Sequence, residues 1–351
     1  MLEEIVTPLV KWYRENKRIL PWRDKGNAYY TWVSEIMLQQ TRVEAVKPYF
    51  ERFITELPDV ESLADCPQEK LLKLWEGLGY YNRVRNMQEA AQTVKKEYNG
   101  RLPEDYQALL SLKGIGSYTA GAIASIAYGI NVPAVDGNVL RVISRITESA
   151  EDISRQAVRK KIEQQLQEIM PEECPGDFNQ ALMELGAVVC IPNGKAKCGE
   201  CPVASVCLAY RHDKVDSLPV KAPKKARMLE DRTVFIIQDG ECTAIRKRPE
   251  KGLLAGLYEL PNIQGHLKRE EALLYVEKMG LDPLYIEKLP PAKHIFSHIE
   301  WRMQAYRIKV SSLKKAQDRE LIFADKEQSG KQYAIPSAFG AYAKYIKEET
   351  R

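Results

Sequence analysis

The chain lacks the features that would place a protein of its size in a membrane or in the secretory pathway. No uninterrupted apolar run is long enough to cross a bilayer. The amino terminus lacks the charged, apolar and small-residue order of a signal peptide. It instead carries apolar residues at helical spacing: Leu2, Ile5, Val6, Leu9 and Trp12. We therefore predict a cytoplasmic protein with no membrane partner.

The net charge is small and cysteines are few. A net charge of +4 over 351 residues does not by itself establish nucleic acid as the partner. Seven cysteines in a chain of this length argue against the disulfide framework of short secreted domains. Three of them, Cys66, Cys174 and Cys242, are isolated in the sequence. We predict that these three are ordinary buried residues.

The other four cysteines lie close together and are the most informative feature that is present. Cys190, Cys198, Cys201 and Cys207 are spaced C-x7-C-x2-C-x5-C. Structural zinc sites usually pair two C-x2-C arms that are far apart in the sequence. One C-x2-C flanked by single cysteines is closer to the loop that holds a 4Fe–4S cluster. The spacing favours the cluster and leaves zinc and unliganded thiols as alternatives.

Length and pattern predict two domains. Residues 1–215 carry apolar residues at three-to-four spacing and almost no strand pattern, which predicts an all-α domain. Residues 216–230 contain two prolines and a run of basic residues, which predicts an extended linker. Residues 231–351 contain alternating strands, a turn at Asp239–Gly240 and a final helix over 336–349, which predicts a smaller α+β domain.

The segment Leu112–Gly129 contains two glycines, Gly114 and Gly116, around Ile115 and between helical stretches. Such a turn can present backbone N–H groups and a helix amino terminus to a phosphate. An ordinary tight turn between two helices is the alternative. Asp136 follows and precedes another predicted helix, where an aspartate commonly serves as an N-cap.

Glu35 is embedded in a helix that is apolar nearly all round. A solvated surface position is the common alternative, but this setting predicts burial, which raises the pKa of a carboxyl and makes it a general acid. A protonated glutamate beside an ionised aspartate is the pair that cleaves glycosidic bonds. The sequence alone does not show that Glu35 and Asp136 meet.

These motifs, in this order, resemble a known family. LKGIGSYTAGA, VDGNV and the four-cysteine loop resemble the endonuclease III-like members of the helix–hairpin–helix DNA glycosylase superfamily. The segments that narrow the resemblance to MutY-type adenine DNA glycosylases are LPWR, SEIMLQQTRV, WEGLGYYNRVRN, LLAGLYELP and HIFSHIEW. The resemblance implies a hairpin at about 105–128, one 4Fe–4S cluster on the loop 190–207, and a Nudix-like 8-oxoguanine recognition domain over 231–351.

The implied reaction is removal of adenine mispaired with 8-oxoguanine or guanine in duplex DNA, by a monomer associated with the nucleoid. The adenine must leave the base stack to be reached. By resemblance, Glu35 protonates the adenine and Asp136 stabilises the sugar cation. Asn138 orients Asp136, and Tyr118 and Arg23 line the sugar and acid sites.

Resemblance also assigns the DNA-binding residues. Gln40 and Tyr80 would wedge into the duplex, with Thr41 and Leu78 beside them, and Gly114 and Gly116 would hold a phosphate. The second domain lacks the glutamate-dense helix of a Nudix hydrolase, so it should recognise rather than hydrolyse. Its lesion-contacting residues would be His294, Phe296, Ser297 and His298, although this segment could instead be the plain start of a strand.

Two features separate this chain from its relatives. Bifunctional relatives have a lysine where Tyr118 stands, and a phenol cannot form the Schiff base that cuts the strand. We therefore expect base removal alone, with a glycosylase/lyase, a non-catalytic damage-binding protein and an iron–sulfur redox or regulatory protein as alternatives. The first cysteine spacing is one residue longer than is usual in the family, in a loop where Lys195 and Lys197 are expected to contact phosphates.

Overall fold

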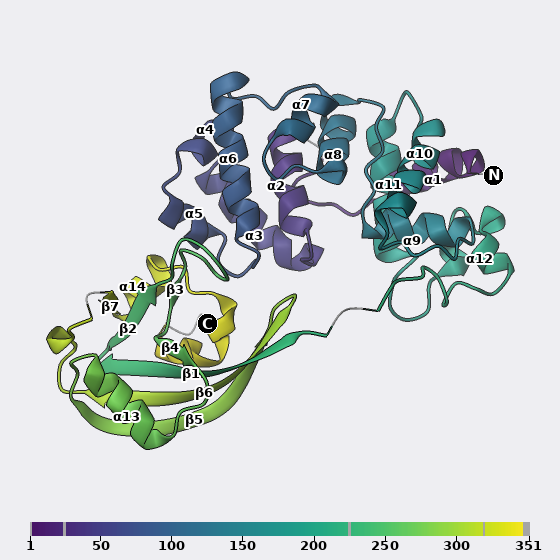
Figure 1. Cartoon of the computed structure of the whole chain (residues 1–351). Helices are drawn as coiled ribbons and strands as arrows, with labels where there is room; N and C mark the ends of the chain where they lie inside the picture. Colours follow the sequence, from purple (N-terminus) through teal and green to yellow (C-terminus); the bar gives the residue numbers. More distant parts are fainter. Residues whose placement is uncertain (1, 24–25, 224–225, 319, 347–351) are drawn as a thin grey trace. The chain divides into compact units, whose positions relative to one another are not determined.

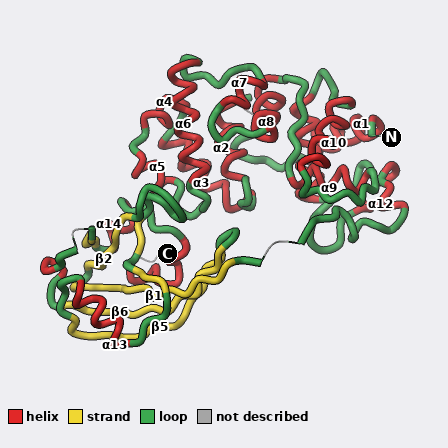
Figure 2. The backbone as a smooth tube through the Cα atoms, viewed as in Figure 1, coloured by secondary structure: helices red, strands yellow, loops and turns green. Residues whose placement is uncertain are grey.

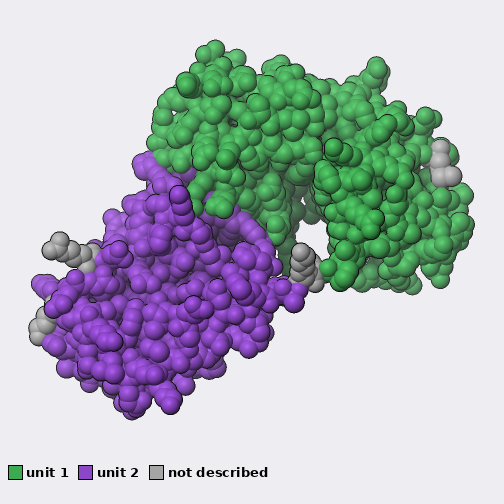
Figure 3. Space-filling model, in the orientation of Figure 1, with its two compact units in different colours: residues 1–66, 82–223 green, residues 67–81, 224–351 purple. Residues whose placement is uncertain are grey.

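The computed structural model describes residues 2–23, 26–223, 226–318 and 320–346 (Figure 1). The chain forms two compact units (Figure 3). We call Met1–Cys66 with Asn82–Pro223 the helical unit, and Pro67–Tyr81 with Lys224–Arg351 the sheet unit. No helix in the described part of the chain combines the length and apolar character needed to span a membrane.

The regular elements described in the helical unit are all helices (Figure 2). This confirms the predicted all-α class for the first domain. The α-helices are α1 (Val6–Asn16), α2 (Ala28–Leu38), α3 (Val43–Glu56), α4 (Val60–Asp65), α6 (Asn82–Glu97), α7 (Tyr106–Ser111), α8 (Ser117–Tyr128), α9 (Gly137–Ile146), α10 (Gln156–Glu168), α11 (Pro175–Val188) and α12 (Leu208–Arg211). Short 3-10 helices are η1 (Glu3–Ile5), η2 (Cys198–Glu200) and η3 (Ala204–Val206).

Local sequence explains where the helices that carry the site begin and end. Asn27 precedes α2, and its side-chain oxygen accepts hydrogen bonds from the first-turn amides of Tyr29 and Tyr30. Helix α6 ends in a turn where Asn99 and Gly100 both have positive φ, as the Asn–Gly pair predicts. Helices α1, α9 and α11 share one apolar core, which fixes α9 and α11 against each other.

Helices α7 and α8 form the predicted hairpin. Gly114 has a φ of +75°, which a side chain would disfavour, and a Cβ there would lie 2.7 Å from Cβ of Asn86. Gly116 is the N-cap of α8 and has no side chain to accept from the amides of the first turn. Ile115, between the two glycines, is buried and anchors the turn. The backbone thus makes a tight turn between α7 and α8, and the first turn of α8 has no side-chain cap.

The sheet unit is built on a seven-stranded sheet with the order β3-β2-β1-β6-β5, where β4 also pairs with β1 and β7 with β2. Strands β1 and β6 are parallel and the other pairs antiparallel. The strands are β1 (Met228–Asp239), β2 (Cys242–Lys247), β3 (Tyr258–Glu259), β4 (Asn262–Gln264), β5 (Pro283–Ile295), β6 (Ile299–Val310) and β7 (Leu321–Ala324). Helices α5 (Gln68–Leu74), α13 (Arg269–Lys278) and α14 (Lys326–Lys331) and the 3-10 helices η4 (Leu313–Lys315) and η5 (Ser337–Tyr345) complete it.

Two apolar cores lie on the two faces of this sheet. On one face, Phe235 and Ile237 of β1 pack with Val276 of α13. On the other, Trp301 of β6 packs with Phe339 of η5. The sheet-with-helices arrangement confirms the predicted α+β class. The final helix predicted over 336–349 is instead the 3-10 helix η5, and residues 347–351 lie outside the described residues.

Segment Pro67–Tyr81 lies in the predicted helical domain but is grouped with the sheet unit. The Tyr258 hydroxyl donates to Glu69 at 2.9 Å, and Lys73 Nζ donates to the carbonyl of Tyr333 at 2.9 Å. The carboxylate of Glu76 accepts from the Ile335 amide at 2.7 Å. These hydrogen bonds explain why Pro67–Tyr81 is grouped with the sheet unit rather than with the helical unit.

The segment between the units is shorter than the predicted linker 216–230. Leu218 is buried in the core of the helical unit, and the Ile153 amide donates to the carbonyl of Val220 at 3.1 Å. Strand β1 already begins at Met228. The predicted linker residues Lys224 and Lys225 lie outside the described residues.

The prediction that the three isolated cysteines are buried is correct for Cys66 alone. Cys174 and Cys242 are only partly buried. Cys174 precedes α11 at its N-cap, and Cys242 begins an antiparallel strand after a turn. Element ends of this kind remain partly open to solvent, which a residue type alone does not reveal.

Candidate active site

A cavity of about 570 Å³ in the helical unit brings the predicted catalytic residues together. A cavity of this size is in the range that holds a small molecule or an extruded base. The catalytic candidates that line it are Arg23, Glu35, Tyr118, Asp136 and Asn138, and the candidate wedge residues are Gln40 and Thr41. The loop before α2, the hairpin helix α8 and the start of α9 therefore converge, although they are far apart in the sequence.

Glu35 lies on α2 and is 7% exposed, which supports the predicted burial over a solvated position. Burial is the main cause that raises its pKa from 4.5 to about 7, and the nearby charge of Asp136 adds to the rise. A hydrogen bond from the Tyr118 hydroxyl and the charge of Arg23 oppose it. Glu35 therefore holds a proton for a large fraction of the time near neutral pH.

Asp136 is the N-cap of α9, so the cap alternative is also correct. Its Oδ1 accepts from the Val139 amide at 2.7 Å, and its Oδ2 accepts from Nδ2 of Asn138 at 2.8 Å. Burial raises the pKa of Asp136, and these two hydrogen bonds oppose that rise. The cap bond uses one oxygen only, and Asp136 also lines the cavity, so capping and catalysis are compatible roles for one carboxylate.

A chain of hydrogen bonds extends from Asp136 to the cysteine loop. Arg141 Nη2 donates to Oδ1 of Asn138 at 2.8 Å, and its Nε donates to the carbonyl of Cys190 at 2.8 Å. Arg141 also donates to the Gly186 carbonyl at 2.8 Å. A Cβ on Gly186 would lie 2.6 Å from Cβ of Asn138, so only glycine allows α11 to approach α9 this closely.

Glu184 on α11 is a site residue that the sequence analysis missed. Its side chain is 1% exposed, and it accepts from Arg23 at 2.7 Å and from Arg18 at 2.6 Å. Burial would raise the pKa of Glu184, but the hydrogen bonds and charges of the two arginines outweigh burial and lower it to about 2. Glu184 holds Arg23 in place, and Arg23 also lies over the Tyr13 ring. An acidic residue in the otherwise apolar stretch ALMELGAV was the available signal.

The four clustered cysteines line one cavity of their own, together with apolar side chains such as Val142, Leu185 and Val203. Arg145 Nη1 donates to Sγ of Cys190 at 3.2 Å. Within the described residues, no three cysteine, histidine or acidic side chains converge as a single metal ion would require.

The two predicted wedge residues have unusual backbone conformations. Gln40 has a φ of +62° and Tyr80 a φ of +48°, both in the left-handed region that non-glycine residues rarely adopt. Such strain is often kept at functional sites. Tyr80 is 48% exposed, whereas Leu78 is 6% exposed, so Leu78 supports its turn from inside. Tyr80 belongs to the sheet unit and Gln40 to the helical unit.

The predicted lesion-contacting residues form the tip of the β5–β6 hairpin. The Phe296 amide donates to the Ile299 carbonyl at 2.8 Å, which leaves Ser297 and His298 as the two residues of the turn. Strand β6 begins directly after this turn, at Ile299, and His294 lies in β5, so a plain structural role as the start of a strand remains the alternative to lesion contact. The Ser297 hydroxyl lies 3.2 Å from the Tyr80 hydroxyl, within hydrogen-bonding distance.

Comparison with known proteins shows which families the two units resemble. The family model for base excision DNA repair proteins of the HhH-GPD superfamily matches residues 33–170, and a NUDIX domain model matches residues 233–345. An adenine DNA glycosylase of Buchnera aphidicola (subspecies Acyrthosiphon pisum) is 35% identical over 85% of this chain and 85% of its own length. The chain belongs to the adenine DNA glycosylase family.

Relatives outside bacteria agree with this membership. The mouse adenine DNA glycosylase is 34% identical, over 86% of this chain and 69% of its own length. Among solved structures, a thermostable thymine-DNA glycosylase covers 60% of this chain with a TM-score of 0.54 and 27% identity, over 97% of its own length. An endonuclease III–DNA covalent intermediate gives a TM-score of 0.52 at 23% identity, over 60% of this chain and 96% of its own, which supports the helical fold.

Proposed function

We propose that the protein removes adenine from duplex DNA when the adenine lies opposite 8-oxoguanine or guanine, and leaves an abasic site. The observation that carries this proposal is the buried Glu35, with a pKa raised to about 7, in one cavity with Asp136. Family membership supports adenine as the base. The mispair assignment rests on the sequence resemblance and on the exposed hairpin tip of the sheet unit.

The first half of the reaction is departure of the base. The adenine must be turned out of the stack, since its glycosidic bond is otherwise covered. Glu35 donates its proton to a ring nitrogen of the five-membered ring of adenine. The Tyr118 hydroxyl, by its hydrogen bond, holds the acid in place. The bond between C1′ and the base then breaks, and its electron pair leaves with the protonated adenine.

The second half is capture of the sugar. The carboxylate of Asp136 stabilises positive charge at C1′, and Asn138 holds that carboxylate by the 2.8 Å hydrogen bond. Water then adds to C1′ and loses a proton to the Glu35 carboxylate, which restores the starting state. No amine stands at the position of Tyr118, so the strand stays intact.

We further propose that Cys190, Cys198, Cys201 and Cys207 hold one 4Fe–4S cluster. Four thiols around a shared apolar cavity fit a cluster of several irons better than one zinc ion, for which the thiols would meet at a point. The bound cluster would supply cross-linking of the loop that follows α11. No step of the base removal passes through it.

The hairpin glycines Gly114 and Gly116 are proposed to bind a DNA phosphate, and Gln40 and Tyr80 to enter the duplex. Lys195 and Lys197 on the cysteine loop would add phosphate contacts. In the sheet unit, the tip residues His294, Phe296, Ser297 and His298 are proposed to contact 8-oxoguanine. We propose that a monomer carries all of these sites.

The test is a panel of duplexes incubated with the full-length protein. Adenine opposite 8-oxoguanine and opposite guanine should yield alkali-labile sites, whereas adenine opposite thymine should not. The strand should break only after alkali treatment. Breaks without alkali would favour a glycosylase/lyase, and tight binding of the 8-oxoguanine duplex with no alkali-labile site would favour a damage-binding protein.

A further inference from the structure

The hairpin tip of the sheet unit is connected to the interior by an unbroken stack of side chains. The rings of His294 and Phe296 meet edge to face, with centroids 4.6 Å apart. Phe296 in turn meets Trp301, with centroids 5.0 Å apart and planes at 73°. Trp301 is fully buried, so the position of the turn Ser297–His298 depends on where this indole ring lies.

Within the described residues, the indole nitrogen of Trp301 does not fix the ring by a hydrogen bond. In the part of the chain that the structure describes, its indole N–H is buried and has no acceptor. Its ring is instead covered by the guanidinium of Arg232, whose Cζ lies 4.2 Å from the ring centroid. A cation over the face of a tryptophan is attractive, most strongly where water is excluded. Arg232 is therefore the charged contact of the ring.

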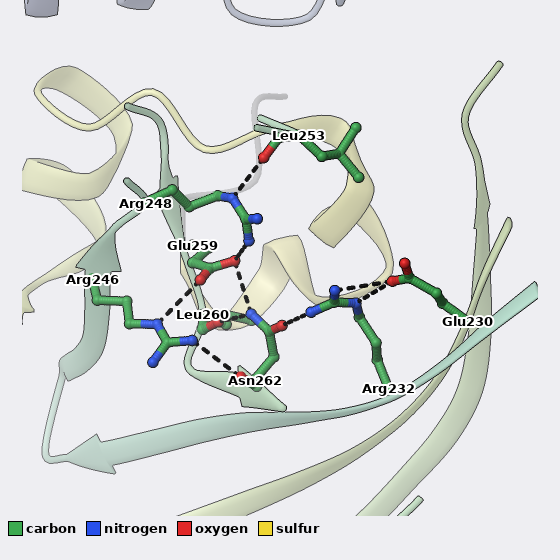
Figure 4. Close-up of polar contacts among 8 residues, drawn as sticks. All are labelled: Glu230, Arg232, Arg246, Arg248, Leu253, Glu259, Leu260 and Asn262. Carbon is green, nitrogen blue, oxygen red and sulfur yellow. Dashed lines mark hydrogen bonds and ion pairs between the residues drawn. The ribbon is translucent and has the colours of Figure 1, made fainter. Parts of the chain in front are cut away.

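Arg232 is itself fixed by its polar partners, shown in Figure 4. Its Nη2 and Nε donate to Oε2 of Glu230 at 3.0 and 3.2 Å. Its Nη1 donates to Oδ1 of Asn262 at 2.7 Å. Glu230 is paired with Trp301 across strands β1 and β6, so its carboxylate holds the guanidinium of Arg232 over the indole ring of Trp301. A guanidinium held at both ends of its fork has little freedom to leave the indole.

A buried carboxylate anchors the other end of this arrangement. The side chain of Glu259 is 3% exposed and pairs with Arg246 at 3.1 Å and with Arg248. It also accepts from Nδ2 of Asn262 at 2.9 Å, which turns the Asn262 oxygen toward Arg232. Figure 4 shows this series of contacts from Arg248 and Arg246 through Glu259 and Asn262 to Arg232 and Glu230.

The backbone completes the support of the tip. The Met228 amide, at the start of β1, donates to the carbonyl of His298 at 2.9 Å. The same strand thus holds the turn directly through Met228 and indirectly through Arg232, Trp301 and Phe296. Two attachments of one strand to a two-residue turn leave Ser297 in a defined position.

We infer that Arg232 is a specificity-determining positioning residue, which fixes Ser297 for contact with the base opposite adenine by holding Trp301 and Phe296. The inference rests on the proposed role of the tip in contacting 8-oxoguanine. Arg232 is not among the residues that line the cavity of Glu35 and Asp136. Its loss should therefore weaken discrimination between 8-oxoguanine and guanine and leave base removal itself intact.

The experiment compares full-length Arg232→Met with wild type in single-turnover excision of adenine opposite 8-oxoguanine and opposite guanine. The preference for 8-oxoguanine, measured at subsaturating protein, should fall about twofold to thirtyfold, the range of a cation–π contact. The rate at saturating protein on the guanine duplex should change less than about twofold. Arg232→Lys keeps the cation without the fork and should retain part of the preference.

The matched control is Arg307→Met. Arg307 lies on β6, the strand that carries Trp301, and its guanidinium is 5.3 Å from the centroid of the Tyr345 ring. Its Nε donates to Oε1 of Gln238 at 2.9 Å, at the end of β1 away from Met228. It should lower the melting temperature about as much as Arg232→Met without changing the preference. Equal losses on both duplexes in Arg232→Met would indicate a purely structural role and overturn the inference.

Ser297→Ala separates this inference from the proposed function. If Ser297→Ala lowers the preference and Arg232→Met does not, the tip contacts the lesion but Arg232 does not position it. If neither variant changes the preference, the proposed role of the tip fails, and the inference fails with it. If Arg232→Met does not fold, the same comparison is made with Arg232→Lys, whose unchanged preference would equally refute the inference.

Discussion

Replacing Glu35 with glutamine should abolish base removal and at the same time stabilise the protein at alkaline pH. The amide has no proton to donate to adenine, so activity is lost. The amide also has no charge, so the folded protein no longer has to hold a buried carboxylate. The same burial that makes Glu35 useful as an acid makes it costly when ionised.

The size of the effect follows from the pKa. Burial raises the pKa of Glu35 from 4.5 to about 7, and about 1.4 kcal/mol per pKa unit gives a cost of about 3 kcal/mol once the carboxyl is ionised. Below pH 4.5 the group is protonated in both the folded and unfolded states, so there is no cost. The cost grows as the pH rises from 4.5 and is complete above about 7.

The assay is urea unfolding of wild type and Glu35→Gln at pH 5 and pH 8.5. At each pH, the urea concentration at the unfolding midpoint is compared between the variant and wild type. This difference should be larger at pH 8.5 than at pH 5 by roughly 1 M of urea, for an m-value of about 3 kcal/mol/M. Glu184→Gln is the matched control, because the pKa of that glutamate is lowered to about 2 by its two arginines. It should destabilise the protein at pH 8.5. A midpoint difference for Glu35→Gln that is independent of pH would refute the argument.

Two further predictions concern the surroundings of the catalytic pair. Gly186→Ala places a Cβ 2.6 Å from Cβ of Asn138 and should lower the single-turnover rate of adenine removal at least about tenfold. The control Gly330→Ala, whose Cβ would have nothing within 4 Å, should leave this rate unchanged. Equal rates for the two variants would show that Asn138 tolerates displacement. The purified protein should be yellow-brown with about four irons per chain, and Cys198→Ser should lose that iron and bind duplex DNA more weakly; a colourless protein with one zinc ion would contradict the cluster.

The sequence predicts much of this site because its signals are local. Glu35 could be placed in a buried setting because the residues around it on α2 are apolar, and Asp136 could be placed at a helix start. The hairpin glycines, the four cysteines and the strands around Asp239–Gly240 were likewise recognisable from nearby residues. The structure confirms the burial of Glu35, the position of Asp136 at the start of α9, the turn at the hairpin glycines and the strands on either side of Asp239–Gly240.

What the sequence does not predict depends on contacts between distant residues. Arg23 and Glu184 are 161 positions apart, so nothing local indicates that they pair. The hydrogen bond from Tyr118 to Glu35 spans 83 positions. The grouping of residues 67–81 with the sheet unit depends on partners such as Tyr258 and Tyr333. Likewise, Arg232 is an ordinary strand arginine until its position over Trp301 is known.

The most direct test of the account is the single-turnover rate of adenine removal as a function of pH, in wild type, Glu35→Gln and Asp136→Asn. With a protonated Glu35 and an ionised Asp136 both required, the wild-type rate should fall as the pH rises through about 7, the pKa of Glu35. It should also fall in acid as Asp136 takes up a proton. Both variants should lose several orders of magnitude in rate and still bind the duplex. A wild-type rate that is constant from pH 5.5 to 8.5, or near-normal turnover in either variant, would contradict the account.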